Sequence, residues 1–183
     1  MITLNLIKTS HPDYEGVEKL LLAAFPEAER RDTGLQRKFT DENEKFQCYA
    51  IRNEEICIGV ITVWSLNGFH YIEHFATVPE VRNRGYGKEI MGTLTGQLKG
   101  TVILEVERPE DEMSRRRIGF YERCGFTLCK QDYLQPPYRK GGEAVPLYLM
   151  FIHTESIDGQ YTQIRDEIYR EVYQTTPEAI LEK

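Results

Sequence analysis

The sequence contains no apolar run long enough to cross a bilayer. Its longest, residues 147–152, falls far short of the ~20 residues that a membrane helix needs. The N-terminus also lacks a basic region followed by an apolar stretch, which a secretion signal would show. We therefore expect a cytoplasmic protein that does not bind membranes.

Positively charged residues are also fewer than negatively charged residues. The chain has 23 Lys and Arg against 29 Asp and Glu, a formal net charge of -6. Such a balance gives no global electrostatic reason to bind nucleic acid, and aromatic residues do not interleave with the arginines. A cationic substrate suits this charge better than a polyanionic partner.

The sequence has only four cysteines, and their spacing matches no paired-cysteine motif. Cys48, Cys57, Cys124 and Cys129 lie in apolar or strand-like surroundings and form no C-x-x-C motif. No neighbouring histidine or helix start would activate any of these thiols. We expect reduced core cysteines, no catalytic thiol and no metal site.

The length of 183 residues suits one domain with a full core. Hydrophobic content of 40% and charged content of 28% are ordinary for a globular protein, and neither an internal repeat nor a low-complexity segment is present. We expect a domain over residues 1–153. Residues 154–183 form a charged tail with apolar positions at four-residue spacing, which predicts one amphipathic helix. The tail helix either packs on its own domain or forms a homodimer contact.

Periodicity places the remaining elements. Alternating or continuous apolar residues predict strands, and apolar residues on one face predict helices. The predicted strands are residues 1–8, 46–52, 56–66, 69–78, 101–107, 126–130 and 145–152, and the predicted helices follow Tyr14, Asp32, Lys88 and Pro109. Asn67-Gly68 is a hairpin turn signal, so the third and fourth strands should pair antiparallel. The fourth strand, the helix after it and the next strand predict a right-handed β-α-β crossover.

One stretch, residues 78–89, indicates a phosphate-binding loop between the fourth strand and its helix. Gly85 and Gly87 leave the free backbone N–H groups of the first helical turn open to an anion. The helix dipole and three basic side chains add positive charge there. These side chains are Arg82, Arg84 and Lys88. The alternative is a tight turn with a solvated basic face.

Two common phosphate motifs do not match this loop. A third glycine is missing at the spacing of a dinucleotide-binding fingerprint. No Gly-Lys-Ser/Thr closes the turn as in a P-loop. The frame Arg82-x-x-Gly85-x-Gly87 instead resembles the acyl-CoA pyrophosphate loop of the GNAT superfamily of N-acetyltransferases.

A second motif supports this resemblance. Phe120-Tyr121-Glu122, followed by Gly125-Phe126, is similar to the segment that follows the CoA loop in GNAT proteins. The two motifs are separated by a helix and a buried strand, and the order of elements matches from about residue 2 to residue 153. Only the tail lies outside the resemblance.

The resemblance implies a mixed α/β fold with a mostly antiparallel, twisted sheet and a central β-α-β acyl-CoA site. The sheet would open after the fourth strand so that the pantetheine arm of acetyl-CoA enters there. Backbone groups of residues 75–78 would meet the pantetheine and the acyl carbonyl, and amides of residues 83–88 would hold the pyrophosphate. The implied cofactor-binding residues are Phe75, Ala76, Thr77, Val78, Arg82, Asn83, Arg84, Gly85, Tyr86, Gly87, Lys88 and Ser114.

The implied reaction is direct transfer of an acetyl group from acetyl-CoA to a primary amine of a small molecule or peptide. Tyr121 occupies the position where the family often places its general acid, although a tyrosine there also fills the helix–sheet interface. Glu73 is the predicted base, with Glu105 and Glu107 as alternatives. By strand alternation His74 should face away from Glu73, and we expect it to be a satisfied core or surface histidine.

The sequence departs from the family pattern on the helix that carries Tyr121. Ser114 replaces the usual asparagine and can still bond to pantetheine, whereas Arg117 replaces a small alanine. Arg115 and Arg116 are expected on a solvated helix face. A catalytically silent domain that binds acyl-CoA and recruits a partner is the alternative function. The identity of the acceptor is not fixed by the fold.

Overall fold

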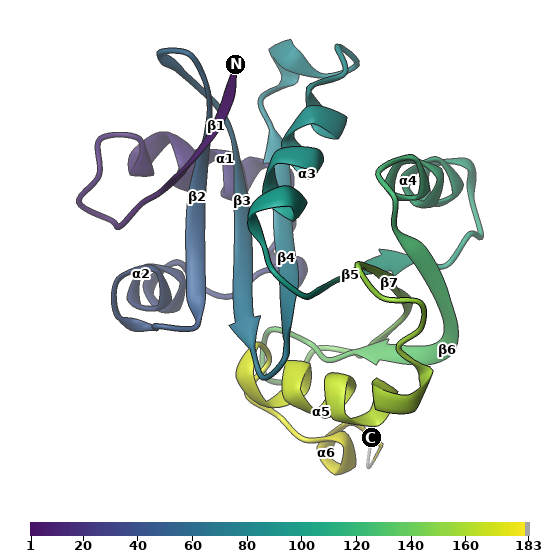
Figure 1. The fold of residues 1–183 in the computed structure, drawn as a ribbon. Coiled ribbons are helices and arrows are strands. Elements are labelled where there is room, and N and C mark those ends of the chain that lie inside the picture. The colour runs from purple at the N-terminus through teal and green to yellow at the C-terminus, as the bar shows by residue number, and fades with distance from the viewer. Residues whose placement is uncertain (182–183) are drawn as a thin grey trace. The chain divides into compact units, whose positions relative to one another are not determined.

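The computed structural model describes residues 1–181. Over these residues the fold is mixed α/β with a seven-stranded, mostly antiparallel sheet, which confirms the predicted fold class (Figure 1). The chain divides into two compact units. Unit 1 comprises residues 1–65 and 72–99, and unit 2 comprises residues 66–71 and 100–183.

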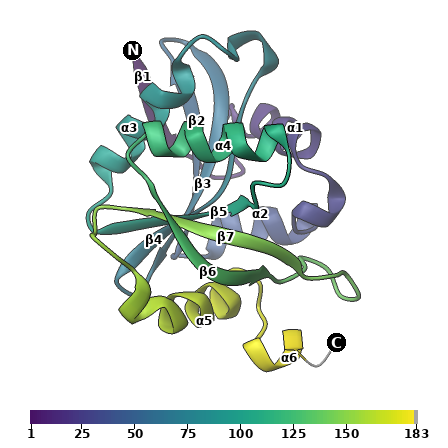
Figure 2. The same cartoon turned by 90° about the vertical axis from the view of Figure 1, so that its right-hand side faces the viewer.

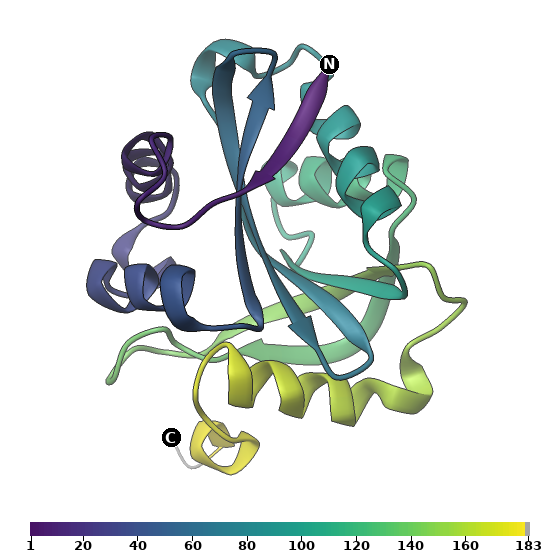
Figure 3. The same ribbon diagram turned by 60° about the vertical axis from the view of Figure 1, so that its left-hand side comes forward.

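In unit 1 the strand order is β1-β2-β3-β4, and the β1–β2 and β2–β3 pairs are antiparallel. Helices α1 and α2 cover one face of these strands and α3 covers the other (Figure 3). The elements are β1 (Ile2–Leu6), α1 (Tyr14–Ala24), α2 (Thr33–Glu42), β2 (Phe46–Asn53), β3 (Ile56–Leu66), β4 (Phe69–Thr77) and α3 (Tyr86–Gln97), with 3-10 turns at Glu27–Glu29 and Pro79–Val81.

The strands of unit 1 bury their side chains because helices pack on both of their faces. Along β3, consecutive residues from Ile58 to Trp64 are all buried, as expected for a strand with helices on both faces. Val17 and Leu21 bring the apolar face of α1 into the core. The side chain of Asp32 caps α2 by accepting a hydrogen bond from the Leu35 amide at 2.9 Å.

In unit 2 the strand order is β5-β7-β6, and both pairs are antiparallel. Helix α4 lies on one side of these strands and α5 on the other (Figure 2). The elements are β5 (Thr101–Glu107), α4 (Glu112–Arg123), β6 (Thr127–Gln135), β7 (Val145–Ile152), a 3-10 turn at Asp158–Gln160, α5 (Tyr161–Glu171) and α6 (Pro177–Leu181). Leu149 and Met150 on β7 are fully buried between these layers.

The prediction of one continuous tail helix was wrong for the described residues. The helix ends at Glu171, and a new helix begins at Pro177. Gln174 has a positive φ of 54°, which leaves the right-handed helical region. Pro177 has no N–H to donate and therefore suits the first position of a new helix. Residues 182–183 of the predicted tail lie outside the described part.

The tail packs within its own unit. The phenol of Tyr161 donates to the Asp132 carbonyl at 2.7 Å, and the phenol of Tyr169 donates to the Leu134 carbonyl. Ile164 and Ile168 on the same helix are buried. This is the first of the two predicted roles of the tail, and a homodimer contact stays a prediction.

Two of the four cysteines lie in the core as predicted, whereas Cys57 and Cys124 are half-buried. None forms a disulfide among residues 1–181, and Cys48 and Cys129 are buried. Burial raises the pKa of the Cys48 thiol to about 12, so this thiol stays protonated and unreactive near neutral pH. Within the described chain, every helix is too short or too polar to cross a membrane.

Candidate active site

The glycine loop joins β4 to α3 in unit 1. Gly85 is the N-cap of α3 and has a φ of 84°, in the left-handed region that a Cβ disfavours. Asn83, two residues earlier, also has a positive φ, 61°. These two left-handed residues turn the chain sharply into α3. The Tyr86 and Gly87 amides that open α3 have no partner inside the helix by helix geometry, whereas the Lys88 amide donates to the Gly85 carbonyl at 3.2 Å.

Positive charge surrounds these amides. The side chains of Arg84 and Lys88 are exposed, and the loop around Gly85 is open to solvent. Arg82 is also exposed, but its guanidinium folds back to the Thr77 carbonyl at 3.1 Å. An anion at the start of α3 would therefore meet free N–H groups, the helix dipole and two exposed cationic residues.

The two edges of β4, the strand before the loop, differ in their backbone hydrogen bonds. On one edge, the Val78 amide donates to the Ile58 carbonyl at 2.9 Å and the His74 amide donates to the Thr62 hydroxyl at 3.0 Å. Because successive residues of a strand alternate, the amides of Phe75 and Thr77 point to the opposite edge. Of the predicted pantetheine contacts, the Val78 N–H is thus already used inside unit 1.

Gly59 on β3 allows the backbone of β4 to pack closely against β3. A Cβ at Gly59 would stand 2.6 Å from the Ala76 carbonyl oxygen and 3.3 Å from the Thr77 Cα. Both contacts are with backbone, so β4 would have to shift to accept any larger residue. Sequence reasoning missed this glycine, because the close approach of two strands leaves no local signal.

The predicted base, Glu73, lies in a buried ion pair. Both oxygens of its carboxylate contact the guanidinium of Arg31, and the Trp64 indole N–H donates to one of them at 2.9 Å. The side chain of Arg31 is 2% exposed and that of Glu73 is 0% exposed. Arg31 also lies over the rings of Phe39 and Trp64, at 5.0 and 5.7 Å from the centroids.

This pairing opposes the base role predicted for Glu73. Burial by itself would raise the pKa of the Glu73 carboxyl, but the Arg31 charge and the hydrogen bonds hold that pKa below its ordinary value. A carboxylate with a lowered pKa is a weak proton acceptor. Glu73 and Arg31 instead join β4 to the segment before α2, a link the sequence did not indicate because residues 27–31 look like a charged connection.

His74 is buried, so of the two predicted environments, core and surface, it occupies the core. Its Nε2 lies 2.9 Å from the Glu29 carbonyl oxygen and its ring contacts Phe25 edge-on, with centroids 4.5 Å apart. Burial lowers the pKa of the imidazole. The expectation that His74 faces away from Glu73 was wrong, because its Nδ1 lies 3.9 Å from the Glu73 Oε2. Alternation sets where a side chain leaves the backbone, and these two are long enough to approach each other.

Helix α4 of unit 2 begins with a capping box that uses Ser114. The Ser114 amide donates to the Asp111 carboxylate at 2.7 Å, and the Asp111 amide donates to the Ser114 hydroxyl at 3.1 Å. Ser114 is buried, 3% exposed. Its hydroxyl therefore stabilises the start of α4, and the predicted bond to pantetheine would have to compete with this role.

Tyr121 lies near the end of α4 and is half-buried. Its ring contacts Phe120 and Phe126, with centroid distances of 5.1 and 5.8 Å. Burial raises the pKa of the phenol to about 12, and the nearby Arg117 only partly offsets this effect. None of the residues that the structure describes forms a hydrogen bond with the phenol oxygen. The hydroxyl thus keeps its proton near neutral pH and has it available to donate.

The arginines of α4 have local partners. Arg117 forms an ion pair with Glu107 at 2.6 Å, and both side chains are about half exposed. Arg116 pairs with Glu112 one turn earlier, and Arg115 donates to the Pro109 carbonyl at 3.2 Å. These contacts agree with the predicted solvated helix face. They also leave Glu107 at the surface, with its side chain about half exposed.

Glu105, the other carboxylate considered on β5, lies in a different environment. It accepts hydrogen bonds from the phenols of Tyr133 and Tyr173 and from the Gln135 amide. Burial raises the pKa of the Glu105 carboxyl, and the hydrogen-bond donors only partly reverse this shift. Sequence reasoning did not connect these tyrosines with Glu105, since they come from β6 and from the segment after α5.

A groove of about 480 Å³ lies elsewhere in unit 2. It is lined by the β3–β4 turn and by one side of α5 and the residue before it, through Asn67, Phe69, Gln160, Gln163, Ile164, Asp166, Glu167 and Arg170. None of the predicted site residues lines it. Its size alone gives it no chemistry, and the paired Arg170 and Glu167 satisfy each other.

The sequence matches the acetyltransferase (GNAT) family model over residues 14–126. The chain belongs to the GNAT family. A GNAT-family acetyltransferase from Bacteroides thetaiotaomicron is 41% identical to it, with a TM-score of 0.92 over 95% of this chain and 99% of that chain. Membership of the family gives this GNAT chain its reaction class, acetyl transfer from acetyl-CoA.

Two more distant structures show a likeness of fold alone. A GNAT acetyltransferase from Elizabethkingia anophelis with acetyl-CoA bound is 14% identical, with a TM-score of 0.58 and coverage of 84% and 98% of the two chains. A spermidine N-acetyltransferase chimera of Vibrio cholerae SpeG and hSSAT is 14% identical, with a TM-score of 0.62 and coverage of 82% and 94%. No curated protein matches the GNAT chain.

Proposed function

We propose that this GNAT chain transfers the acetyl group of acetyl-CoA to a primary amine of a small molecule or a peptide by direct attack. The glycine loop is the observation that carries the proposal. Its left-handed Gly85 opens α3 toward solvent beside two exposed cationic residues, Arg84 and Lys88. The acetyl-CoA bound to the Elizabethkingia acetyltransferase supports the same cosubstrate here.

The amides of residues 83–88 would hold the pyrophosphate of acetyl-CoA. The Phe75 and Thr77 amides, which point away from β3, would meet the pantetheine arm and the acyl carbonyl. A carbonyl oxygen that gains negative charge during attack is stabilised by such fixed N–H donors. Arg82, tied to the Thr77 carbonyl at 3.1 Å, would hold the end of this strand in place.

Tyr121 is the proposed general acid. The amine nitrogen attacks the thioester carbon, the carbon–sulfur bond breaks, and the departing thiolate takes the phenol proton, which water then replaces. The proton lost by the nitrogen passes to water. Two observations support this role: the Tyr121 hydroxyl has no protein partner among the described residues, and burial keeps it protonated.

Glu73 is not part of this proposal, because its carboxylate serves Arg31 and Trp64. The amine therefore enters the reaction as its free base. The rate at low amine concentration should rise with pH until the amine is fully deprotonated. It should not fall again in the alkaline range until the pH approaches the pKa of Tyr121, about 12.

Calorimetric titration with acetyl-CoA, followed by a thiol-release assay with a panel of amines, tests the proposal. Acetyl-CoA should bind tightly and with salt dependence. NAD, which has a pyrophosphate but no pantetheine arm, should bind much more weakly. The double variant Arg84→Gln, Lys88→Gln should lose about tenfold or more in affinity, whereas Lys130→Gln, an exposed lysine of β6, should not. Absence of acetyl-CoA binding, or equal loss in the control, would refute the assignment of the loop.

A further inference from the structure

The start of α3 lacks a capping side chain. Its N-cap is Gly85, which has no side chain to accept a hydrogen bond from the first helical amides. Gly85 and Gly87 also lose more conformational freedom on ordering than other residues do. The first turn of α3 therefore depends on contacts from outside the glycine loop for a fixed conformation.

Tyr86, the first residue of α3, makes such a contact. The side-chain amide of Asn53 donates a hydrogen bond to the Tyr86 phenol oxygen at 3.2 Å, and both residues are half-buried. Tyr86 lies between Gly85 and Gly87, and its backbone amide is one of the two that open α3 without a helical partner. The bond from Asn53 therefore holds a residue whose backbone N–H belongs to the candidate pyrophosphate site.

Asn53 is itself held by its neighbours. It is the last residue of β2 and pairs with Ile56 across the turn between β2 and β3. The guanidinium of Arg52 donates to the Glu55 carbonyl in this turn and forms an ion pair with Asp13. Asp13 is the N-cap of α1. The turn is thus joined both to the sheet and to the start of α1, so Asn53 gives Tyr86 a fixed anchor.

We propose that Asn53 is a positioning residue for the cosubstrate. It acts through the Tyr86 phenol and holds the first turn of α3 in the conformation that receives the pyrophosphate of acetyl-CoA. This role rests on the proposed function, because it requires the glycine loop to bind acetyl-CoA. A hydrogen bond that already orders the loop in the free protein lowers the entropy lost when the ligand binds. Asn53 therefore increases the affinity for acetyl-CoA.

Calorimetric titration with acetyl-CoA measures the contribution of this bond. Asn53→Ala and Tyr86→Phe each remove it, and each should weaken acetyl-CoA binding about three- to tenfold, the usual effect of one hydrogen bond. The double variant should bind no more weakly than the weaker single variant, because both substitutions remove the same bond. Additive losses in the double variant, or wild-type affinity in the folded single variants, would overturn the positioning role.

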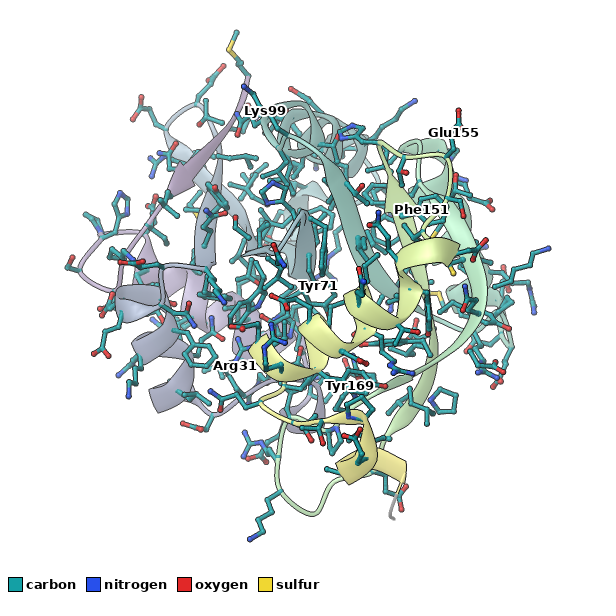
Figure 4. All side chains as sticks on the ribbon, turned by 60° about the horizontal axis from the view of Figure 1, so that its bottom comes forward. Arg31, Tyr71, Lys99, Phe151, Glu155 and Tyr169 are labelled. Carbon is teal, nitrogen blue, oxygen red and sulfur yellow. The ribbon has the colours of Figure 1, made fainter. Side chains whose placement is uncertain are left out.

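Two control variants change unit 1 away from the loop. Asn43 is also half-buried, precedes β2, and accepts a hydrogen bond from the Lys45 amide at 2.9 Å, so Asn43→Ala matches Asn53→Ala in chemistry. Lys99→Ala removes an exposed side chain beyond the other end of α3 (Figure 4). Both should bind acetyl-CoA like the wild type, and thermal unfolding shows whether each variant is folded. An equal loss of affinity in Asn43→Ala would overturn the positioning role.

Hydrogen exchange of the free protein tests the same bond without acetyl-CoA. The Lys88 and Glu89 amides donate to the Gly85 carbonyl at 3.2 and 3.5 Å and so close the first turn of α3. Asn53→Ala should speed the exchange of these two amides, whereas Asn43→Ala should not. Unchanged exchange in Asn53→Ala would show that this residue does not hold the turn, and would overturn the positioning role.

Kinetics and the loop variants separate this role from the proposed function. With the amine of the panel that releases thiol fastest, Asn53→Ala should raise KM for acetyl-CoA and leave kcat unchanged. A lowered kcat with unchanged KM would refute the positioning role. Binding that falls in Arg84→Gln, Lys88→Gln but not in Asn53→Ala would support the proposed function and refute this role alone. Absence of acetyl-CoA binding by the wild type would refute the proposed function, and this role with it.

Discussion

Replacing Glu73 by Gln tests whether this residue is structural or catalytic. The substitution keeps the shape of the side chain and removes the carboxylate charge that faces the Arg31 guanidinium in the core. Breaking a buried ion pair in this way costs about 3–5 kcal/mol. A domain of this kind has about 5–15 kcal/mol of stability in total. Glu73→Gln should therefore lower the urea midpoint strongly, and the folded fraction should retain its activity.

The pH dependence of this loss has a definite sign. The pKa of Glu73 is lower in the folded protein than in the unfolded chain, where it is about 4.5. The ion pair therefore stabilises the fold fully above about pH 4.5 and is lost as the pH falls through the folded-state pKa. The stability difference between wild type and Glu73→Gln should shrink in acid and be constant near neutral pH.

A double-mutant cycle with Arg31→Met isolates the pair. Removing both charges leaves no uncompensated ion, so the double variant should be more stable than the sum of the single losses predicts, by about 1 kcal/mol or more. Glu15→Gln, which breaks an exposed pair with Lys19, serves as the control and should leave the urea midpoint unchanged. If Glu73→Gln folded as stably as the wild type and instead lost rate most steeply where the amine is protonated, the structural role would be refuted and Glu73 would be the base.

Three other substitutions have specific expected outcomes. Tyr121→Phe should lower kcat by about 10²- to 10⁴-fold with little change in acetyl-CoA affinity, and full kcat in steady-state assays would exclude the acid role. Gly85→Ala places a Cβ at a φ of 84°. It should weaken acetyl-CoA binding, measured by calorimetry, by a larger free energy than the loss of stability measured by thermal unfolding. Unchanged affinity would show that the loop does not bind the cosubstrate. Gly59→Ala puts a Cβ 2.6 Å from the Ala76 carbonyl and should both destabilise the fold and raise KM for acetyl-CoA. A stable variant with normal KM would show that β4 needs no close approach there.

The glycine loop was predictable from sequence because its chemistry is local. The apolar strand, Gly85 and the basic residues lie within about a dozen consecutive positions, and the helix start is set by the residues that form it. Tyr121 was found in the same way, through the pattern Phe120-Tyr121-Glu122 before a glycine. In each case the side chains and the backbone that positions them belong to one short segment.

The environment of each carboxylate was not predictable in this way. Sequence reasoning favoured Glu73 as the base and kept Glu105 and Glu107 as alternatives, since all three lie on apolar strands. The structure gives each a different partner: Arg31 for Glu73, phenols for Glu105 and the exposed Arg117 for Glu107. Burial and pairing decide the pKa of a carboxyl, and neither is visible in the residues next to it.

The sequence by itself determined the order of elements, the glycine-capped start of α3 and the family, because these depend on local periodicity and short motifs. Only the tertiary structure decided that Arg31 pairs with Glu73, which lies 42 positions away in the chain, and that Tyr173 bonds to Glu105 across 68 positions. Desolvation and electrostatic pairing act through space, so chain separation carries no information about them. The roles of the charged residues were therefore decided by the fold.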